Sequence, residues 1–182
     1  VIEIDGDDDD ALGMQAKRIE AVATVCGALT FRVAQSQQES DDLWAIRRGI
    51  SSAIGGLAPN RLGEDISVPR DAFPDVVRRI RTISEKYQLT IAVYGHAGDG
   101  NIHPSVLCDL SKPGEAARVH DAVNELFDAA LAVGGTLSGE HGIGITKRPY
   151  ITKALGQAGV RTLQAVKAAL DPKGILNPGK IW

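Results

Sequence analysis

A glycine-rich turn between two short apolar stretches limits the choice of fold more than any other feature of this sequence. Residues 89–94 (LTIAVY) and 102–107 (IHPSVL) have the composition of strands, and Gly98, Asp99 and Gly100 lie between them. Because glycine takes positive φ at little cost, these three residues favour a turn. The connection is far too short for a crossover between parallel strands. The sequence therefore predicts an antiparallel hairpin.

Outside this hairpin, the pattern alternates single strands with single helices. An apolar period of two predicts strands over residues 1–6, 29–33 and 66–68. Helical spacing predicts helices over residues 11–25, 43–54, 71–83, 113–133 and 160–170, followed by an irregular tail. We therefore expect an α+β fold, a ferredoxin-like sandwich with a mostly antiparallel sheet and additional C-terminal helices. A doubly wound parallel sheet is disfavoured by the hairpin.

The composition excludes several classes of protein. Hydrophobic residues make up 43% of the 182 residues, which is enough for a core. The chain has 20 Lys and Arg against 23 Asp and Glu, a formal net charge of −3, which argues against nucleic acid as a partner. No apolar run approaches the roughly 20 residues of a membrane helix. We expect Cys26 and Cys108 to be buried free thiols in a reducing, cytoplasmic setting.

Two glycine-rich motifs hold three of the four histidines. In YGHAGDGNIHP, a four-residue loop over residues 97–100 would place His96 opposite Asn101 and His103 on the same sheet face. The second motif, GGTLSGEHGIG, contains Glu140 and His141. Adjacent residues of an extended segment point in opposite directions, so we expect these two to do different jobs.

Two histidines and one carboxylate leave open coordination positions, as catalytic metal sites do. The sequence thus predicts a metal centre formed by both motifs, with either Glu140 or His141 as the additional ligand. The fourth histidine, His120, lies in a predicted helix without such neighbours and is not expected to take part.

The motifs GHAGDGNIHP and LSGEHGIG and the terminal DPKGILNPGKIW resemble the C-terminal domain of FAD-linked 2-hydroxyacid dehydrogenases of the glycolate oxidase, D-lactate dehydrogenase and D-2-hydroxyglutarate dehydrogenase type. The resemblance covers nearly the whole chain. It implies that residues 1–182 are one substrate- and metal-binding domain, and that an N-terminal domain absent from this chain holds most of the FAD. The chain also opens directly on the strand-like VIEIDG, which we interpret as the continuation of a preceding domain.

The resemblance also implies roles for individual residues. It makes His96, His103 and Glu140 ligands of a divalent ion, zinc or manganese. His141 would accept the proton of the substrate hydroxyl, and Arg47 would pair with the substrate carboxylate. Asn177, in the tail, would lie near the flavin.

Two positions depart from the D-2-hydroxyglutarate branch, which has a lysine where Gly63 stands and an asparagine where Ser105 stands. We therefore expect a smaller substrate of the glycolate or D-lactate type, oxidised to the 2-oxo acid with hydride transfer to FAD. We also expect a homo-oligomer, an electron-transfer partner and a cytoplasmic location, with the surface of the inner membrane as the alternative.

Two other functions fit the residues less well. A free-standing metal-dependent hydrolase would use the same ligands, but the sequence offers it no oxyanion clamp. A non-catalytic ferredoxin-like binding module would leave the histidine motifs unused.

Overall fold

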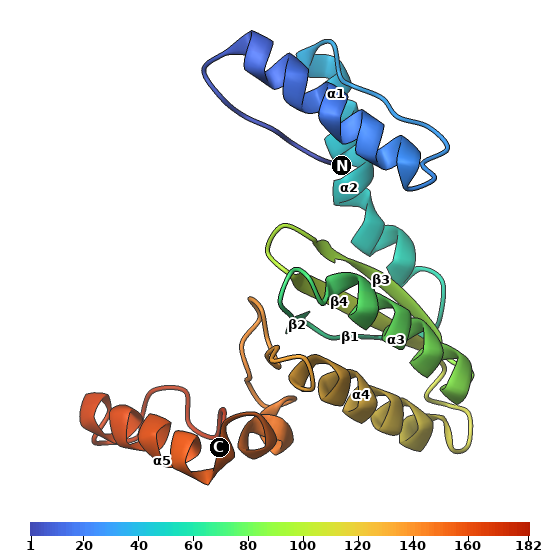
Figure 1. Cartoon of the computed structure of the whole chain (residues 1–182). Helices are drawn as coiled ribbons and strands as arrows, with labels where there is room; N and C mark the ends of the chain where they lie inside the picture. The colour runs from blue at the N-terminus through green and yellow to red at the C-terminus, as the bar shows by residue number, and fades with distance from the viewer. The chain divides into compact units, whose positions relative to one another are not determined.

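The computed structural model describes residues 1–182, which form two compact units, residues 1–54 and residues 55–182. We call them the N-terminal unit and the C-terminal unit. Helices α1 and α2 belong to the first, and all strands and the remaining helices belong to the second (Figure 1).

The N-terminal unit contains α1 (Asp9–Val25) and α2 (Gln37–Gly55). The side chain of Asp8 caps α1 by accepting a hydrogen bond from the amide of Ala11. The start of α2 was predicted six residues too late. Ser36 Oγ accepts from the amide of Glu39, and the Glu39 carboxylate accepts from the amide of Gln35. This reciprocal cap starts the helix earlier than the apolar spacing from residue 43 had indicated.

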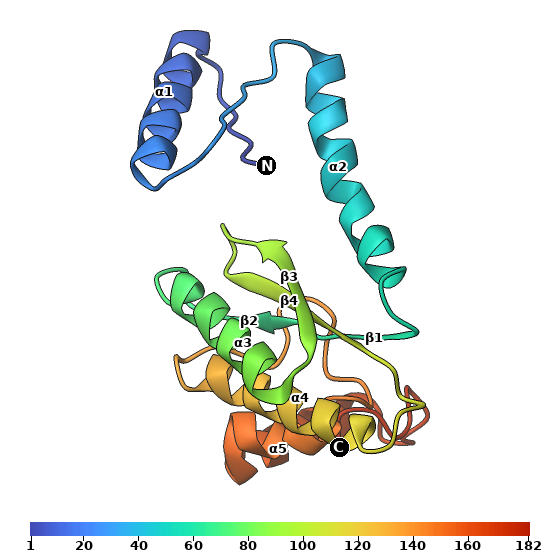
Figure 2. The ribbon, with the colours of Figure 1, turned by 90° about the vertical axis from the view of Figure 1, so that its right-hand side faces the viewer.

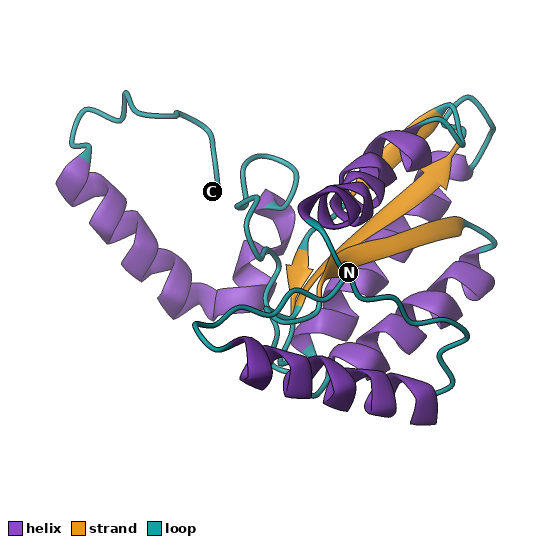
Figure 3. Cartoon of the chain, turned by 90° about the horizontal axis from the view of Figure 1, so that it is seen from above, coloured by secondary structure: helices purple, strands orange, loops and turns teal.

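The strands predicted over residues 1–6 and 29–33 are wrong, because both segments are irregular and are drawn as loops (Figure 3). Their alternating pattern is real, but a strand also needs a neighbour that completes its backbone hydrogen bonds. The prediction that Cys26 is buried is also wrong, since this residue is exposed at the C-terminal end of α1. Neither helix of this unit has a buried residue, so a thiol there finds no core to enter.

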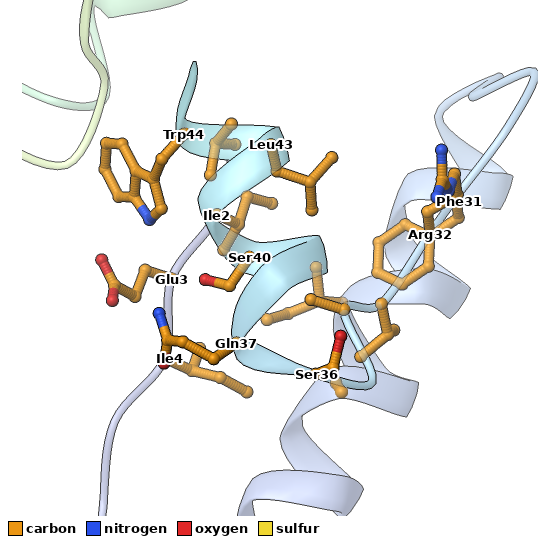
Figure 4. A pocket seen from close by; sticks show the side chains of 15 residues that line it. Ile2, Glu3, Ile4, Phe31, Arg32, Ser36, Gln37, Ser40, Leu43 and Trp44 are labelled. Atoms are coloured by element: carbon orange, nitrogen blue, oxygen red, sulfur yellow. The ribbon is translucent and has the colours of Figure 1, made fainter. Parts of the chain in front are cut away.

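The N-terminal unit has an open hollow of about 340 Å³. Ile2 of the first segment, Phe31 of the second and Leu43 and Trp44 of α2 line it together with polar side chains (Figure 4). Apolar residues of both irregular segments thus face this hollow instead of a sheet.

The C-terminal unit is built around an antiparallel sheet of β1 (Asn60–Gly63), β2 (Ile66–Ser67), β3 (Thr90–His96) and β4 (Asn101–Cys108). β4 lies in the centre, with β3 along one side and β1 and β2 along the other. The predicted hairpin and the predicted α+β class with an antiparallel sheet are confirmed. The alternating pattern did not reveal β1.

Pro104 explains why β1 and β2 are separate strands. Both pair with β4 in one continuous register, which would bring Glu64 opposite Pro104 and Asp65 opposite His103. The amide of Glu64 donates to the carbonyl of Pro104, but Pro104 has no N–H to donate in return. The ladder is therefore interrupted at residues 64–65, beside the centre of β4.

Two helices, α3 (Phe73–Tyr87) and α4 (Glu115–Leu131), lie side by side on one face of the sheet (Figure 2). Their apolar faces bury Ile80, Leu126 and Phe127 against Ile102 and other core residues. Even-numbered residues of β4 enter this core. Odd-numbered residues, including His103, therefore point to the opposite face of the strand.

The chain ends with a 3₁₀ turn, Arg148–Tyr150, and α5 (Ile151–Leu170), which is kinked at Gly156. Residues 171–182 form the irregular tail that the sequence predicted (Figure 3). Asp171 ties the tail down by accepting hydrogen bonds from the amides of Ile175 and Leu176 and from Lys167.

Candidate functional site

The β3–β4 hairpin places its two histidines as the four-residue loop predicted. His96 is the cross-strand partner of Asn101, and Tyr94 is the partner of His103. At the end of the turn, Gly100 has a φ of 70°, and a side chain there would overlap the carbonyl oxygen of Val68. Glycine is thus required both for the backbone angle and for the close approach.

The structure brings His96, His103 and Glu140 together. The ring centroids of His96 and His103 lie 5.7 Å apart, and His103 Nε2 lies 3.1 Å from Glu140 Oε1. One potential ligand atom from each of the three residues lies within 4.8 Å of the others. The two motifs therefore converge on one point, although they lie far apart in the sequence.

His141 joins the same cluster. Its ring stacks on that of His103 with centroids 5.2 Å apart and planes inclined by 18°, and its Nε2 lies 3.6 Å from Glu140 Oε1. The expectation that Glu140 and His141 point in opposite directions is wrong. The segment is not extended, because three consecutive amides turn toward a single carboxylate oxygen, and both side chains consequently approach His103.

That carboxylate belongs to Asp65, which sequence reasoning did not single out. Its side chain is fully buried. Asp65 Oδ2 accepts from Ser138 Oγ and from the amides of Gly139, Glu140 and His141 at 2.7–3.0 Å. Burial by itself would raise the pKa of Asp65, but these hydrogen bonds and one from Asn101 hold it well below its ordinary value. A carboxylate directly before the buried Ile66 was the available signal, since acids there need strong partners.

Lys147 is the second buried charge that the sequence did not reveal. Its Nζ donates to the carbonyls of Asp65 and Leu137, both at 2.7 Å, and lies 3.9 Å from Glu64 Oε2. Burial lowers the pKa of Lys147 and raises that of Glu64. Lys147 is thus buried and links Asp65 to the start of the Ser138–His141 segment.

The sheet face around His103 carries polar atoms without partners. His103 Nδ1, Asn101 Oδ1 and Ser105 Oγ are buried and accept or donate no hydrogen bond. Burial also lowers the pKa of His103, against the attraction of Asp65 and Glu140, which favours the neutral imidazole that metals bind. Unpaired buried polar atoms are rare in folded proteins, so three of them on one strand call for a specific explanation.

The three remaining residues considered in the sequence belong to elements other than the hairpin and the Ser138–His141 segment. Arg47 is part of α2 in the N-terminal unit, and Asn177 is an exposed residue of the tail with a φ of 46°. Their expected roles stay predictions. His120 is exposed on α4, where its Nδ1 lies 3.0 Å from Asn124 Nδ2.

None of the helices combines the length and the apolar character that crossing a membrane requires.

Comparison with known proteins agrees with the motifs. A family model described as "FAD linked oxidases, C-terminal domain" matches residues 1–181. The glycolate oxidase subunit GlcD of Bacillus subtilis is 40% identical over 166 residues, which are 91% of this chain and 35% of that protein. The D-2-hydroxyglutarate dehydrogenase of Stutzerimonas stutzeri is 37% identical over 154 residues, 82% of this chain and 33% of that protein.

A solved structure shares the fold. The 4-ethylphenol oxidase of Gulosibacter chungangensis, in complex with isoeugenol, superimposes with a TM-score of 0.54 over 93% of this chain and 37% of its own, at 21% identity. The chain therefore spans about a third of the length of the proteins that it matches.

Proposed function

The chain belongs to the family of FAD-linked oxidase C-terminal domains, and we propose that it is the substrate- and metal-binding part of a flavin-dependent dehydrogenase. The enzyme would oxidise a small 2-hydroxy acid to the 2-oxo acid, with hydride transfer to FAD. A separate N-terminal domain would hold most of the FAD, which accepts the hydride when bound.

The observation that carries this proposal is the convergence of His96, His103 and Glu140 on one point. Two imidazoles and one carboxylate form a donor set that suits zinc or manganese and leaves coordination positions open. The position of His103 supports this assignment, since its ring is buried on the central strand and its Nε2 lies 3.1 Å from Glu140 Oε1. When bound, the ion would act as a Lewis acid toward the oxygens of the substrate.

His141 is the residue best suited to accept the hydroxyl proton of the substrate. Its side chain is 58% exposed, while its ring is held against His103. A general base needs both a fixed position and access to the substrate. Arg47 would grip the substrate carboxylate with two parallel hydrogen bonds, and Asn177 would lie near the flavin.

The identity of the substrate class rests on two residues. Gly63 and Ser105, the positions that depart from the D-2-hydroxyglutarate branch, are direct cross-strand partners in β1 and β4. Ser105 Oγ is buried without a hydrogen-bond partner. Neither residue itself carries a cationic side chain, although the Arg61 guanidinium lies about 4 Å from the Cβ position of Gly63 and donates to Tyr94 Oη. The proposal of glycolate or D-lactate as the substrate therefore rests only on the departure of Gly63 and Ser105 from the D-2-hydroxyglutarate branch. A homo-oligomer, an electron-transfer partner and a cytoplasmic location stay part of the proposal.

Metal binding by the chain tests the ligand set directly. We expect the parent chain to retain Zn²⁺ or Mn²⁺ after gel filtration, and the double variant His96→Ala/His103→Ala to retain roughly tenfold less or none. His120→Ala is the matched control, because it removes an exposed histidine outside the cluster. Equal metal content in the double variant and the parent would overturn the metal site.

A further inference from the structure

We propose that Asp65 is a positioning residue that assembles the metal-binding site by holding the segment Ser138–His141 against the β3–β4 hairpin. This inference rests on the proposed function. It concerns a residue that acts on the site through hydrogen bonds to the backbone of that segment and to Asn101.

One oxygen of Asp65 fixes the segment. Oδ2 accepts from Ser138 Oγ at 2.7 Å and from the amides of Gly139, Glu140 and His141 at 3.0, 3.0 and 2.8 Å. Four donors on one atom determine the path of four successive residues. The side chains of Glu140 and His141 reach His103, while the backbone amides of both residues donate to Asp65.

Ser138 extends this arrangement by one residue. While its hydroxyl donates to Asp65, its oxygen accepts from the amide of Gly142 at 2.7 Å. The loop is thereby closed on both sides of Glu140 and His141.

The other oxygen of Asp65 holds the hairpin. Oδ1 accepts from Asn101 Nδ2 at 2.6 Å, and Asn101 is the cross-strand partner of His96. Oδ1 also lies 3.8 Å from Nδ1 of His103. Asp65 therefore contacts both parts of the chain that supply the proposed ligands.

The approach of the segment to Asp65 requires Gly139. A Cβ atom at this position would overlap Asn101 Nδ2 and would lie 3.0 Å from Asp65 Oδ1. The glycine of the motif is thus explained by contact with the carboxylate and its partner rather than by a turn angle.

The positive charge of Lys147 offsets part of the energetic cost of burying the Asp65 carboxylate. Its Nζ lies 3.8 Å from Asp65 Oδ2 and donates to the carbonyls of Asp65 and Leu137. Because Leu137 directly precedes the segment, the same lysine fixes the entry of the loop and balances the charge that organises it.

Asp65→Asn tests the proposal, because it keeps the shape of the side chain and turns one acceptor oxygen into a donor. We expect amide hydrogen exchange at residues 139–142, followed by NMR, to accelerate at least tenfold, while exchange at Val106 and Leu126 stays unchanged. Affinity of the chain for Zn²⁺, measured by titration calorimetry, should fall about 10- to 100-fold.

Asp171→Asn is the matched control. Asp171 also accepts hydrogen bonds from two successive amides and pairs with a lysine, but it does so in the C-terminal tail. This variant should accelerate exchange at Ile175 and Leu176 and leave Zn²⁺ affinity within twofold of the parent.

The outcomes separate this inference from the proposed function. Unchanged exchange at residues 139–142 in a folded Asp65→Asn chain would overturn the role of Asp65, whether or not the chain binds metal. A parent chain that binds no Zn²⁺ would overturn the metal site alone, because the exchange measurement needs no ion.

If Asp65→Asn does not fold, Ser138→Ala decides the question. It removes one donor to Asp65 and the acceptor of Gly142, and we expect a severalfold faster exchange at residues 139–142 in a chain that stays folded. Parent-like exchange in that variant would count against the proposal.

Discussion

The imidazole rings of His103 and His141 lie almost parallel, with centroids 5.2 Å apart. His103 is fixed on the central strand and is 5% exposed, whereas the side chain of His141 is mostly open to solvent. The pair thus joins a ring that the sheet holds in place to one that a ligand can reach.

Replacing His141 should separate catalysis from metal binding. In the full-length flavoprotein that the proposal requires, His141→Asn should lower kcat for 2-hydroxy acid oxidation by about 10²- to 10⁴-fold, because the proton acceptor is lost. Metal content should stay at the parent level, since His96, His103 and Glu140 are intact. His120→Asn should change neither quantity. Parent-like kcat in His141→Asn would refute the assignment of the base.

Gly139→Ala should damage the site by overpacking. The new methyl group would overlap Asn101 Nδ2, so the segment or the asparagine must shift. We expect a loss of about 1–3 kcal/mol in the free energy of unfolding, measured with urea. Gly98→Ala is the control, because no atom lies within 4 Å of its Cβ position and its φ is not positive. Equal stability of both variants would show that the contact with Asn101 is not tight.

The stability of the C-terminal unit should depend on the helix α4. Leu126 is fully buried in the core, and Leu126→Ala should cost about 2–5 kcal/mol of unfolding free energy. Leu170→Ala, at a position that is 78% exposed, should cost less than about 0.5 kcal/mol. A small effect of Leu126→Ala would mean that the surrounding core collapses onto the cavity.

Acid should release the C-terminal tail. Lys167 and the amides of Leu176 and Ile175 hold the pKa of Asp171 below its ordinary value of about 3.9. The ionised form makes these contacts, so they are present above the ordinary value and are lost as pH falls through the lowered pKa. The amide NMR shifts of Ile175 and Leu176 should titrate with a midpoint below about 3.9. In Asp171→Asn they should not titrate, and a midpoint at or above 3.9 would contradict the anchoring role.

The parts of the fold that local sequence determines were predictable. The turn around Gly98–Gly100 fixed the hairpin and its register, and the apolar stripes of α3 and α4 marked the helices that cover it. The segments 1–6 and 29–33 have strand patterns too, but a pattern does not state whether a partner strand is present. The early start of α2 depends on the cap formed by Ser36 and Glu39, which the apolar spacing from residue 43 onward does not indicate.

The convergence of the two histidine motifs was predictable from the sequence, but the contacts that support it were not. His96, His103, Glu140 and His141 stand in distinctive glycine-rich motifs. Asp65 lies outside both motifs, and its importance comes from hydrogen bonds to residues that follow it by more than 70 positions. Such long-range contacts with backbone amides leave no trace in local composition.

The enclosure of Lys147 has a chemical consequence. Its ammonium group is buried and donates to two carbonyl oxygens. An amine-directed acylating reagent should therefore spare this lysine in the folded chain while modifying those on the surface, and the moment at which it begins to react would report the opening of the histidine cluster.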